Sequence, residues 1–573
     1  MATSPMFVDS FKDLVDSCIS FYEESKDKIS LDRVHAKRDK LSGFAEAFHE
    51  DCGTLTPSVQ KRLEDLRNGK GLILMTAHQP NFFAYGGVLR KATLNFVLAK
   101  ALEKILKVPV INFFGIADQD FTDDRWVKSA LLPEVERRGG VLELHFDLPE
   151  KLLLNKVVKP SRQILNGWRT EIEKWFNCRF SSIERSSKSL GLRFTWNFNR
   201  LVENFEEFWK IVDDACGSAE VFSDFNAFIM SKVINDAWGY DTVFSRFSEC
   251  QQIFEDEFCF LLTHFEEYSQ HTKEAIVDMN NPTEGVYERE YDTIPFWYHC
   301  DCGSKARLMA GHQDGFLLGF GECLRCRKGY EINLGSKKAP SLSGIVSRIS
   351  ARSLSMPLIF FAGLEVGCYV GGVGGKEYMQ QASYVARNMG MPFPPVVIWR
   401  PRDVYFGVGQ LEALMMFRKL SSSFDFSQLP AVKAALEDKI ANVQEHIDRL
   451  EHCKEEFAES MHDKKEDTIE RVKVLFAEQN RIRKEADFSS MVRDLKLLEN
   501  IETVMNLHFC MVDYAVNIGS KTTSEQWIAF LQENGSFSSN VPLKTGFEDF
   551  VLNLHGFAAS RKAAREDGRN SFK

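Results

Sequence analysis

Residues with side chains capable of catalysis or ligand binding occur in groups directly after short apolar runs of the sequence. The first of these groups contains a histidine. It follows the apolar run 72–75 and consists of His78, Gln79, Asn81, Gly86 and Gly87. A helical run over 88–107 comes next, so the segment predicts a strand, a turn and a helix. At the carboxyl edge of a parallel sheet, the helix after such a turn offers N–H groups and its positive dipole end to an anion. The pattern lacks G-x-G-x-x-G, so it indicates a nucleotide-type site without indicating a dinucleotide.

Four aspartates follow a second buried run, 108–114, within seven residues: Asp118, Asp120, Asp123 and Asp124. Such a cluster can hold a divalent cation, orient a substrate amine or act as a general base. It can also be a solvated acidic turn that caps the next helix. We favour a functional role because Asp118 and Asp120 would lie at the same sheet edge as His78 if the two units are adjacent. The predicted catalytic residues are therefore His78, Asp118 and Asp120.

A glycine-rich turn supplies the third group, between an apolar strand and a helical run over 378–389. Its residues are Tyr369, Gly371, Gly372, Gly374, Gly375, Lys376 and Glu377. Four glycines in five residues imply positive φ angles or close approach of a ligand, and backbone amides there could cradle phosphate or carboxylate. Lys376 could neutralise a phosphate, and Glu377 could cap the helix or bind a ribose hydroxyl. A tight turn from strand to helix also needs glycine, so the motif alone is weak. With Gln79, Asn81, Gly86 and Gly87, these residues are the predicted cofactor-binding set.

The most specific motif consists of two cysteine pairs: Cys300 and Cys302, then Cys323 and Cys326. Each pair precedes a glycine, and the β-like span between them predicts a zinc ribbon over 298–330. Four thiolates close a tetrahedral coordination sphere, so we expect structural zinc; redox or accidental cysteines are the alternative. His299 and His312 are spare candidates. Each cysteine pair with its turn forms a knuckle, and the second knuckle also carries Arg325, Arg327 and Lys328. These cations could contact phosphate or RNA, or they could balance charge.

The elements that must position these residues follow an α/β rhythm in two separated stretches. We divide the chain into N-terminal helices (1–70), two halves of a parallel-sheet core (71–150 and 340–410), a connective insertion with the ribbon (151–339), a helical arm (411–518) and a C-terminal segment (519–573). The apolar segment 356–375 contains Glu365 and many glycines, so it suits a buried strand and loop better than a membrane span.

The predicted arm is a stretch without glycine or proline, 431–518, in which residues such as Ile440 and Ile447 keep heptad-like spacing. Two such runs indicate either an antiparallel helical arm or a coiled-coil dimer. The stretch 462–467 between them is highly charged, as expected of a solvated helix face. The tail beyond it is polar and basic, with Arg561 and Arg565 among its cations.

Composition bounds the classes of function. The chain has 573 residues, too many for one core, and roughly two to four domains are expected. A formal net charge of −10 argues against a generalised nucleic-acid or anionic-membrane surface. The thirteen scattered cysteines and the acidic start favour a reducing, cytoplasmic location over secretion, with no membrane partner.

Three motifs resemble those of the bacillithiol biosynthesis cysteine-adding enzyme family. Segment 78–83 with Gly86-Gly87 is similar to the family's G-Q-Q-P-G-L-F-G-G, 116–121 to its A-x-E-D-H-D-F, and 369–374 with Glu377 to its Y-V-G-G-P-G-E. The resemblance implies a Rossmann-like core related to class I aminoacyl-tRNA synthetases, a helical insertion, a coiled-coil dimerisation arm, and amide formation between cysteine and a glucosamine-malate amine. The chain departs from the family at His78, Ala117, Gln119 and Arg125-Trp126, where the family has Gln, Glu, His and Asn-His, and by its zinc ribbon.

The sequence thus predicts an ATP-consuming ligase that joins an amino acid, possibly cysteine, to an amine of a small molecule, with ATP and Mg as cofactors and a homodimer formed through the arm. In this hypothesis the glycine turn and Lys376 hold phosphates, His78 donates a hydrogen bond to developing phosphate charge, and Asp118 and Asp120 orient the amine or its metal partner. Two alternatives stay open. A synthetase-like enzyme acting with tRNA is favoured by the basic knuckle and tail and disfavoured by the net charge. A non-catalytic assembly protein would keep the fold for its arm.

Overall fold

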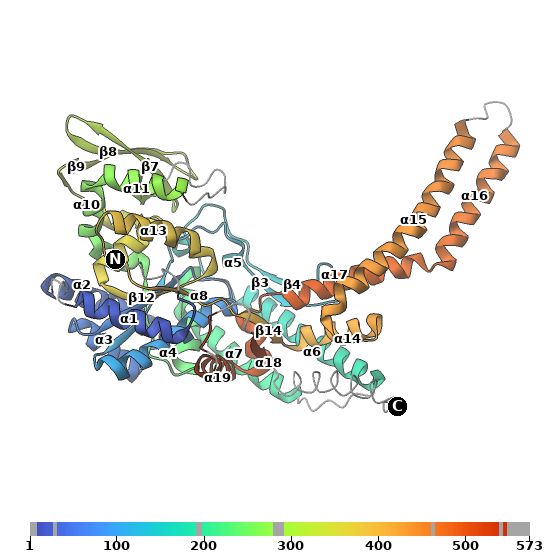
Figure 1. Ribbon diagram of the computed structural model, residues 1–573, viewed down its shortest axis with the longest axis horizontal. Helices are drawn as coiled ribbons and strands as arrows, with labels where there is room; N and C mark the ends of the chain where they lie inside the picture. The colour runs from blue at the N-terminus through green and yellow to red at the C-terminus, as the bar shows by residue number, and fades with distance from the viewer. Residues whose placement is uncertain are drawn as a thin grey trace.

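The computed structural model describes residues 8–26, 31–190, 198–278, 292–459, 465–533, 535–537 and 542–546. Within them, a parallel sheet lies at the centre of the body, an antiparallel sheet forms one end, and a pair of long helices projects away from the body (Figure 1). The fold class is therefore α/β, as predicted. Among the described residues, no helix combines the length and the apolar character needed to cross a membrane.

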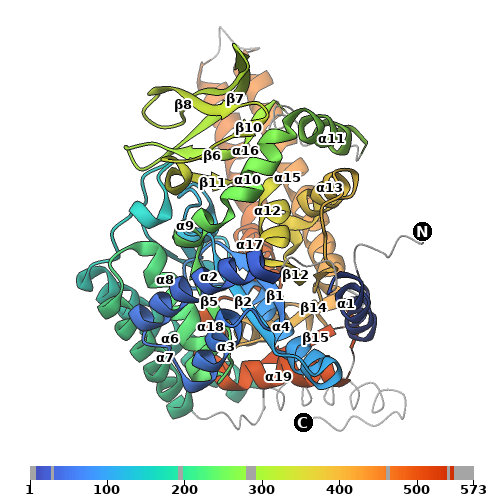
Figure 2. The same ribbon diagram turned by 90° about the vertical axis from the view of Figure 1, so that its left-hand side faces the viewer.

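The central sheet has five parallel strands in the order β13-β12-β1-β2-β5 (Figure 2). Their bounds are β1 (Leu72–His78), β2 (Val110–Ile116), β5 (Val243–Arg246), β12 (Val366–Gly371) and β13 (Val396–Ile398). The chain adds strands outward from β1 on one side and then returns to add β12 and β13 on the other, so the order of addition reverses between β1 and β12. Open parallel sheets bind ligands at the carboxyl ends of the strands beside such a reversal.

Apolar residues alternate between the two faces of the sheet and separate two cores. In β1, Leu72 and Leu74 join one buried cluster, whereas Ile73 and Met75 join the other. The first cluster is covered mainly by α1 (Phe11–Ser25), α4 (Gly86–Leu106), α7 (Phe198–Ser218) and α8 (Phe222–Ser231). The second includes residues of α2 (Leu31–Cys52), α3 (Pro57–Arg67), α10 (Glu255–Thr263), α12 (Ser355–Leu364) and α13 (Lys376–Asn388). Because both faces are covered, the strands are buried almost throughout, as their continuous apolar sequences indicate.

The region 151–339 differs from the single insertion that we expected, because it returns to the central sheet. β5 pairs with β2, Phe114 opposite Phe244. A four-residue strand that includes Ser245 and Arg246 gives no hydrophobic period to detect. The rest of the region begins with α6 (Arg162–Leu190), which precedes α7 and α8, and it follows a hairpin of β3 (Ser129–Pro133) and β4 (Val141–His145).

The apolar segment 356–375 also differs from the expected strand and loop. Its first half forms α12, and only its second half forms β12. A short apolar run buried on all sides has no period that distinguishes helix from strand.

The antiparallel sheet has six strands in the order β10-β9-β8-β7-β6-β11. They are β6 (Thr293–His299), β7 (Lys305–Gln313), β8 (Phe316–Cys323), β9 (Gly329–Ser336), β10 (Ala339–Pro340) and β11 (Ile349–Ala351). The β6–β7 turn, the end of β8 and the β8–β9 turn carry the four cysteines, as a ribbon requires. The ribbon comprises β6 to β9, residues 293–336, and so extends beyond the predicted 298–330. α10 and α11 (Phe265–Asp278) lie beside this sheet (Figure 2).

The projecting helices are α15 (Leu429–Glu459) and α16 (Lys465–Glu485), which lie side by side and antiparallel (Figure 1). The Gln479 side chain ties them by donating to Ile447 O at 3.2 Å. α17 (Phe488–Asn506) returns to the body and packs against α14 (Val408–Ser421). α18 (Met511–Ile518) is buried against α7, so the projection is shorter than the predicted arm, 411–518.

The C-terminal segment continues with α19 (Ser520–Glu533), and β15 (Pro542–Gly546) pairs with β14 (Arg402–Phe406). The basic tail and the first half of the charged stretch, 462–464, lie outside the described residues.

Candidate functional site

A buried lysine lies between the carboxyl ends of β1 and β12. Lys91 on α4 is 7% exposed, and its Nζ donates to Ala77 O at 3.1 Å. A Cβ atom added to Gly372 would lie 3.4 Å from the same Nζ, so the glycine turn after β12 approaches the ammonium closely. Burial lowers the pKa of Lys91 to about 7. The first and third groups of predicted residues therefore meet at one sheet edge, around a cation to which the sequence analysis gave no role.

His78, the last residue of β1, has a fixed tautomer. Its Nδ1 lies 2.9 Å from Gln79 O, and since a carbonyl oxygen only accepts, Nδ1 carries the proton. Burial, and then the positive charge of Lys91, lower the pKa of His78 to about 3, so the ring is neutral at pH 7. The Nε2 atom of a neutral ring in this tautomer is an acceptor. The predicted role of His78 as a donor to phosphate does not fit this geometry.

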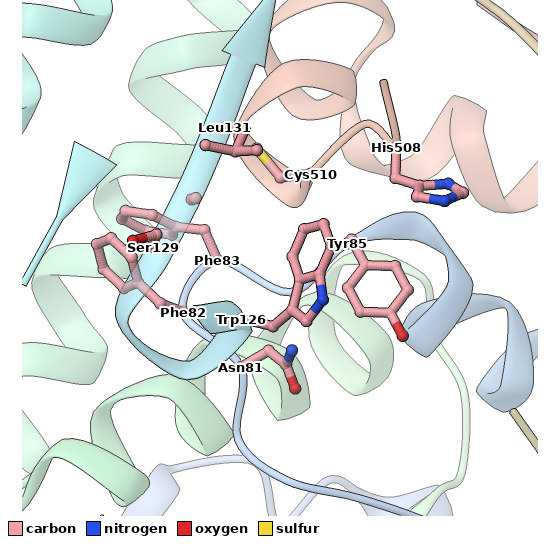
Figure 3. Close-up of a pocket in the computed structure, with 10 residues that line it drawn as sticks. Asn81, Phe82, Phe83, Tyr85, Trp126, Ser129, Leu131, His508 and Cys510 are labelled. Atoms are coloured by element: carbon pink, nitrogen blue, oxygen red, sulfur yellow. The ribbon is translucent and has the colours of Figure 1, made fainter. Parts of the chain in front are cut away.

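Asn81 lies at the floor of a narrow pocket just beyond His78 (Figure 3). It is 1% exposed, and its side chain lies close enough to His78 to oppose the lowering of that residue's pKa, although neither its Oδ1 nor its Nδ2 meets hydrogen-bond geometry with any described residue. Tyr85 and Trp126 line the same pocket, with ring centroids 5.3 Å apart. The cavity of about 10 Å³ is at the lower limit for one water molecule. It suits a water or a small polar group and is far too small for the predicted cofactor.

Gly86 and Gly87 make room for protein side chains. A Cβ atom at Gly86 would lie 2.5 Å from the Phe509 ring, and one at Gly87 would lie 2.7 Å from the Tyr85 ring. The Gly86 N–H donates to Phe509 O at 2.9 Å, so the first amide of α4 is already used. These two glycines therefore do not form the anion site that we predicted at this helix N-terminus.

The glycine turn after β12 has none of the positive φ angles that we expected for Gly371, Gly372, Gly374 or Gly375. Close approach explains two of them: Gly372 faces Lys91, and a Cβ at Gly375 would lie 2.8 Å from the Tyr378 hydroxyl. Lys376 and Glu377 begin α13 and are exposed. Tyr369 is 2% exposed and packs in the second core 5.2 Å from the Phe361 ring, so its predicted cofactor role is not supported.

Three of the four aspartates are occupied by protein groups. Asp118, 1% exposed, accepts the Ser248 N–H at 2.9 Å, the Ser248 hydroxyl and the Asn155 amide, and burial raises its pKa to about 6. Asp123 accepts the N–H of Lys151 at 2.9 Å. Asp124 caps the short helix α5 (Arg125–Lys128) and accepts the Gln79 amide at 2.6 Å. The capping alternative thus describes Asp124 alone, because Asp123 instead accepts a backbone N–H from a distant turn, and the hydrogen bonds of Asp118 stabilise the loop rather than bind a ligand.

Asp120 is different. Among the described residues, no hydrogen bond or ion pair reaches its half-buried carboxylate. Burial raises its pKa, and the nearby charge of Lys305 opposes that rise. Lys305 belongs to β7 and is 4% exposed, with Nζ 5.2 Å from the Phe121 ring centroid. One acid and one base from different domains therefore lie near each other at the carboxyl end of β2.

An aromatic ring from the ribbon completes this second group. The Trp297 ring centroid lies 5.9 Å from Lys305 Nζ and 4.3 Å from Arg352 Cζ. Sequence reasoning missed all three residues because they lie in or after the ribbon. No local pattern places them against the loop after β2.

The four predicted cysteines form a compact cluster. Their Sγ atoms all lie within 4.8 Å of one another, with 3.5 Å between Cys300 and Cys326 and between Cys302 and Cys323. Zinc–sulfur bonds of about 2.3 Å in a tetrahedron separate sulfurs by roughly 3.8 Å, so the cluster could bind a metal such as zinc. His299 bonds Ser350 Oγ at 2.9 Å instead.

The two knuckles turn differently. Gly303 takes φ +82° in the first, as a glycine allows, but in the second Arg327 rather than Gly329 takes the positive φ. The Arg325 N–H points at Cys323 Sγ at 3.4 Å.

The basic residues of the knuckle are engaged within the ribbon. Arg327 pairs with Glu322 at 2.7 Å and Lys328 with Asp301 at 3.1 Å, while Arg325 donates to Cys302 O at 3.2 Å. These contacts favour the charge-balance interpretation over a contact with RNA.

The first knuckle also supports the loop that carries the acids. Leu153 N–H donates to Gly303 O at 2.9 Å, and Leu154 N–H donates to Asp120 O at 3.0 Å. The positions of Asp120 and the cysteine cluster are therefore linked through two adjacent residues.

In comparisons with known proteins, no family model and no curated protein matches the chain.

Proposed function

We propose that the chain is an ATP-dependent ligase with a Rossmann-like core that joins an amino acid, possibly cysteine, to the amine of a small molecule. The observation that carries the proposal is the position of Lys91 at the reversal of strand order, beside His78 and Gly372. A buried ammonium destabilises a fold unless it serves a partner, and such groups concentrate at functional sites. The strand order and the motif resemblance support the same assignment.

In this proposal each group has a separate task. Lys91, the amides around Gly372 and the N-terminus of α13 would hold the phosphates of ATP, with Lys376 adding positive charge, and the phosphate oxygens themselves would hold Mg²⁺. His78 accepts a hydrogen bond through Nε2. Asp120 orients the amino group of the amino-acid substrate, whose carboxyl group, once activated as an adenylate or acyl phosphate, forms a C–N bond with the acceptor amine with loss of AMP or phosphate.

The test uses hydroxylamine as a surrogate amine. The full chain is incubated with ATP, Mg²⁺, hydroxylamine and each of the common L-amino acids, beginning with cysteine. We expect an amino-acid hydroxamate to form together with AMP or ADP. Mass spectrometry detects the hydroxamate, and phosphorus NMR detects the nucleotide products. Absence of nucleotide turnover with every amino acid would leave only the assembly-protein alternative.

Asp120→Asn is expected to lower hydroxamate formation by about 10²- to 10⁴-fold, because the amide keeps the shape but loses the charge that orients the amino group of the amino-acid substrate. ATP binding should stay unchanged, since Lys91 lies at the other side of β1. Asp123→Asn is the matched control: its carboxylate bonds a backbone N–H of the same loop region. Equal rates in both variants would remove Asp120 from the site.

We also propose that the hairpin of α15 and α16 forms a homodimer. Three apolar side chains on α16 are exposed, Ile469 by 52%, Val474 by 65% and Phe476 by 55%. Replacing all three by Ser is expected to convert a dimer to a monomer in light scattering while leaving ATP binding intact. Replacing residues 448–478 by a short Gly/Ser linker should have the same effect, because Ile447 and Gln479 are already in contact. A dimer that survives both changes does not use the hairpin.

A further inference from the structure

The ribbon places a cationic side chain, Lys305, in the candidate site. This side chain is not one of the four cysteine ligands of the metal cluster. Lys305 stands three residues after Cys302 and points its Nζ at the Phe121 and Trp297 rings, 5.2 and 5.9 Å from their centroids. At 4% exposure it is almost fully removed from water, yet no hydrogen bond or ion pair reaches it within the described part of the chain. The two ring faces offset part of the cost of its burial, but the hydrogen-bonded or ion-paired groups that normally compensate a buried ammonium are absent from the described residues.

The charge that complements it is close but not in contact. Asp120 interacts electrostatically with Lys305, although no ion pair within 4.0 Å joins them among the described residues. Asp118 also acts on Lys305 electrostatically, but its oxygens already accept hydrogen bonds from Ser248 and Asn155, and Asp124 accepts one from Gln79, so neither is left to bind a ligand. One carboxylate and one ammonium therefore lie near each other, and within the described ranges neither has a hydrogen-bond or ion-pair partner.

We propose that this pair binds a zwitterionic α-amino acid, with the substrate's ammonium at Asp120 and its carboxylate at Lys305. The inference rests on the proposed ligase function and assigns the ribbon the recognition of the amino-acid substrate. Arg352, which is 2% exposed and stacks 4.3 Å from the Trp297 centroid, adds positive charge on the carboxylate side. A carboxylate has two oxygens, so binding of one at Lys305 leaves the other for activation.

Charge and shape disfavour other ligands at this position. A phosphate would meet the Asp120 carboxylate, and a simple amine would meet the Lys305 ammonium. A zwitterion satisfies both groups at once, and the rings of Phe121 and Trp297 bound the space on its apolar side, with centroids 6.0 Å apart. The substrate class is therefore a free amino acid.

The experiment measures which half of the amino acid each residue recognises. The metal-loaded full chain is first screened by thermal shift against the common L-amino acids, and the best ligand is compared by calorimetry with its carboxamide and its des-amino acid. We expect the zwitterion to bind about ten- to a hundredfold more tightly than either analogue, the range for a lost hydrogen bond to a charged group.

Two variants should then divide this preference. Lys305→Gln is expected to lose the preference over the carboxamide, and Asp120→Asn the preference over the des-amino acid. Lys305→Arg should restore the first preference because it restores the charge. Lys337→Gln, on the same sheet but paired with Glu266 at the surface, should bind like the unchanged chain.

Two outcomes would overturn the inference. One is failure of every amino acid to bind, and the other is unchanged discrimination between the amino acid and its two analogues in both Lys305→Gln and Asp120→Asn. The amount of bound metal and the circular dichroism spectrum identify variants that fail to fold. If Lys305→Gln fails to fold, Asp120→Asn still tests the inference. Binding of ATP without any preference for the zwitterion contradicts this site alone, whereas amino-acid binding without ATP binding contradicts the ligase.

Discussion

Replacing Lys91 by Met should abolish the thermal stabilisation that we expect ATP to give to this protein. A ligand that binds only the native state raises its melting temperature, and loss of a buried charge that contacts phosphate removes most of that affinity. We expect the apparent Kd for ATP to rise by about a hundredfold or more, since charge-assisted contacts in buried sites are the strong ones. The free protein should not lose stability, because Met fills a similar volume without a charge to desolvate.

The control for this change is Lys104→Met, an exposed lysine on the same helix. Adenosine supplies a second control, because it lacks the phosphates that Lys91 is proposed to hold. ATP affinity that survives in Lys91→Met, or falls equally in Lys104→Met, would contradict the proposed phosphate site.

The pH dependence of stability follows from the same lysine. Burial lowers the pKa of Lys91 from 10.5 in the unfolded chain to about 7 in the native state. Between these values the unfolded chain binds more protons than the native state, so the free energy of unfolding rises with pH across that window. The stability difference between Lys91→Met and the unchanged protein should therefore shrink from pH 7 to pH 10, as measured by urea denaturation. Phosphate affinity should fall over the same range, because the ammonium loses its proton.

The sequence was informative wherever a local pattern decides the structure. β1, β2 and β12 each combine an apolar run with turn residues, and all three were predicted. β5 was missed because four residues with a serine and an arginine have no period. α12 shows the same limit in the other direction, since burial on all sides hides the helical repeat.

At the candidate site, residue type predicted position better than role. The turns at His78 and Gly372 do meet, because parallel strands that are neighbours end at one edge. What no local pattern could show is which groups are already used: Phe509 covers the start of α4 from more than four hundred residues away, and Ser248 occupies Asp118. Lys91 and Lys305 were missed for the same reason, since burial of a lysine depends on packing between distant segments.

Loss of the metal cluster is the second large effect that we expect. The double variant Cys302→Ser and Cys323→Ser removes one thiolate from each knuckle and should reduce bound zinc from one ion per chain to none, measured by elemental analysis. Structural zinc sites hold small β-sheets folded, so the ribbon, residues 293–336, should become sensitive to protease. Cys178→Ser, at an exposed thiol outside the cluster, is the matched control.

The consequences of metal loss should be confined to one side of the site. Gly303 O holds Leu153, and Leu154 N–H holds Asp120, so an unfolded knuckle frees the loop that positions Asp120. Hydrogen exchange over 152–156 should therefore accelerate, and hydroxamate formation should fall to the level of Asp120→Asn. ATP binding at Lys91 should persist, because β1 and β12 belong to a different sheet. If the zinc-free variant kept the full rate of hydroxamate formation and slow hydrogen exchange in this loop, the ribbon would be an independent module. It would then not contribute to the structure of the site.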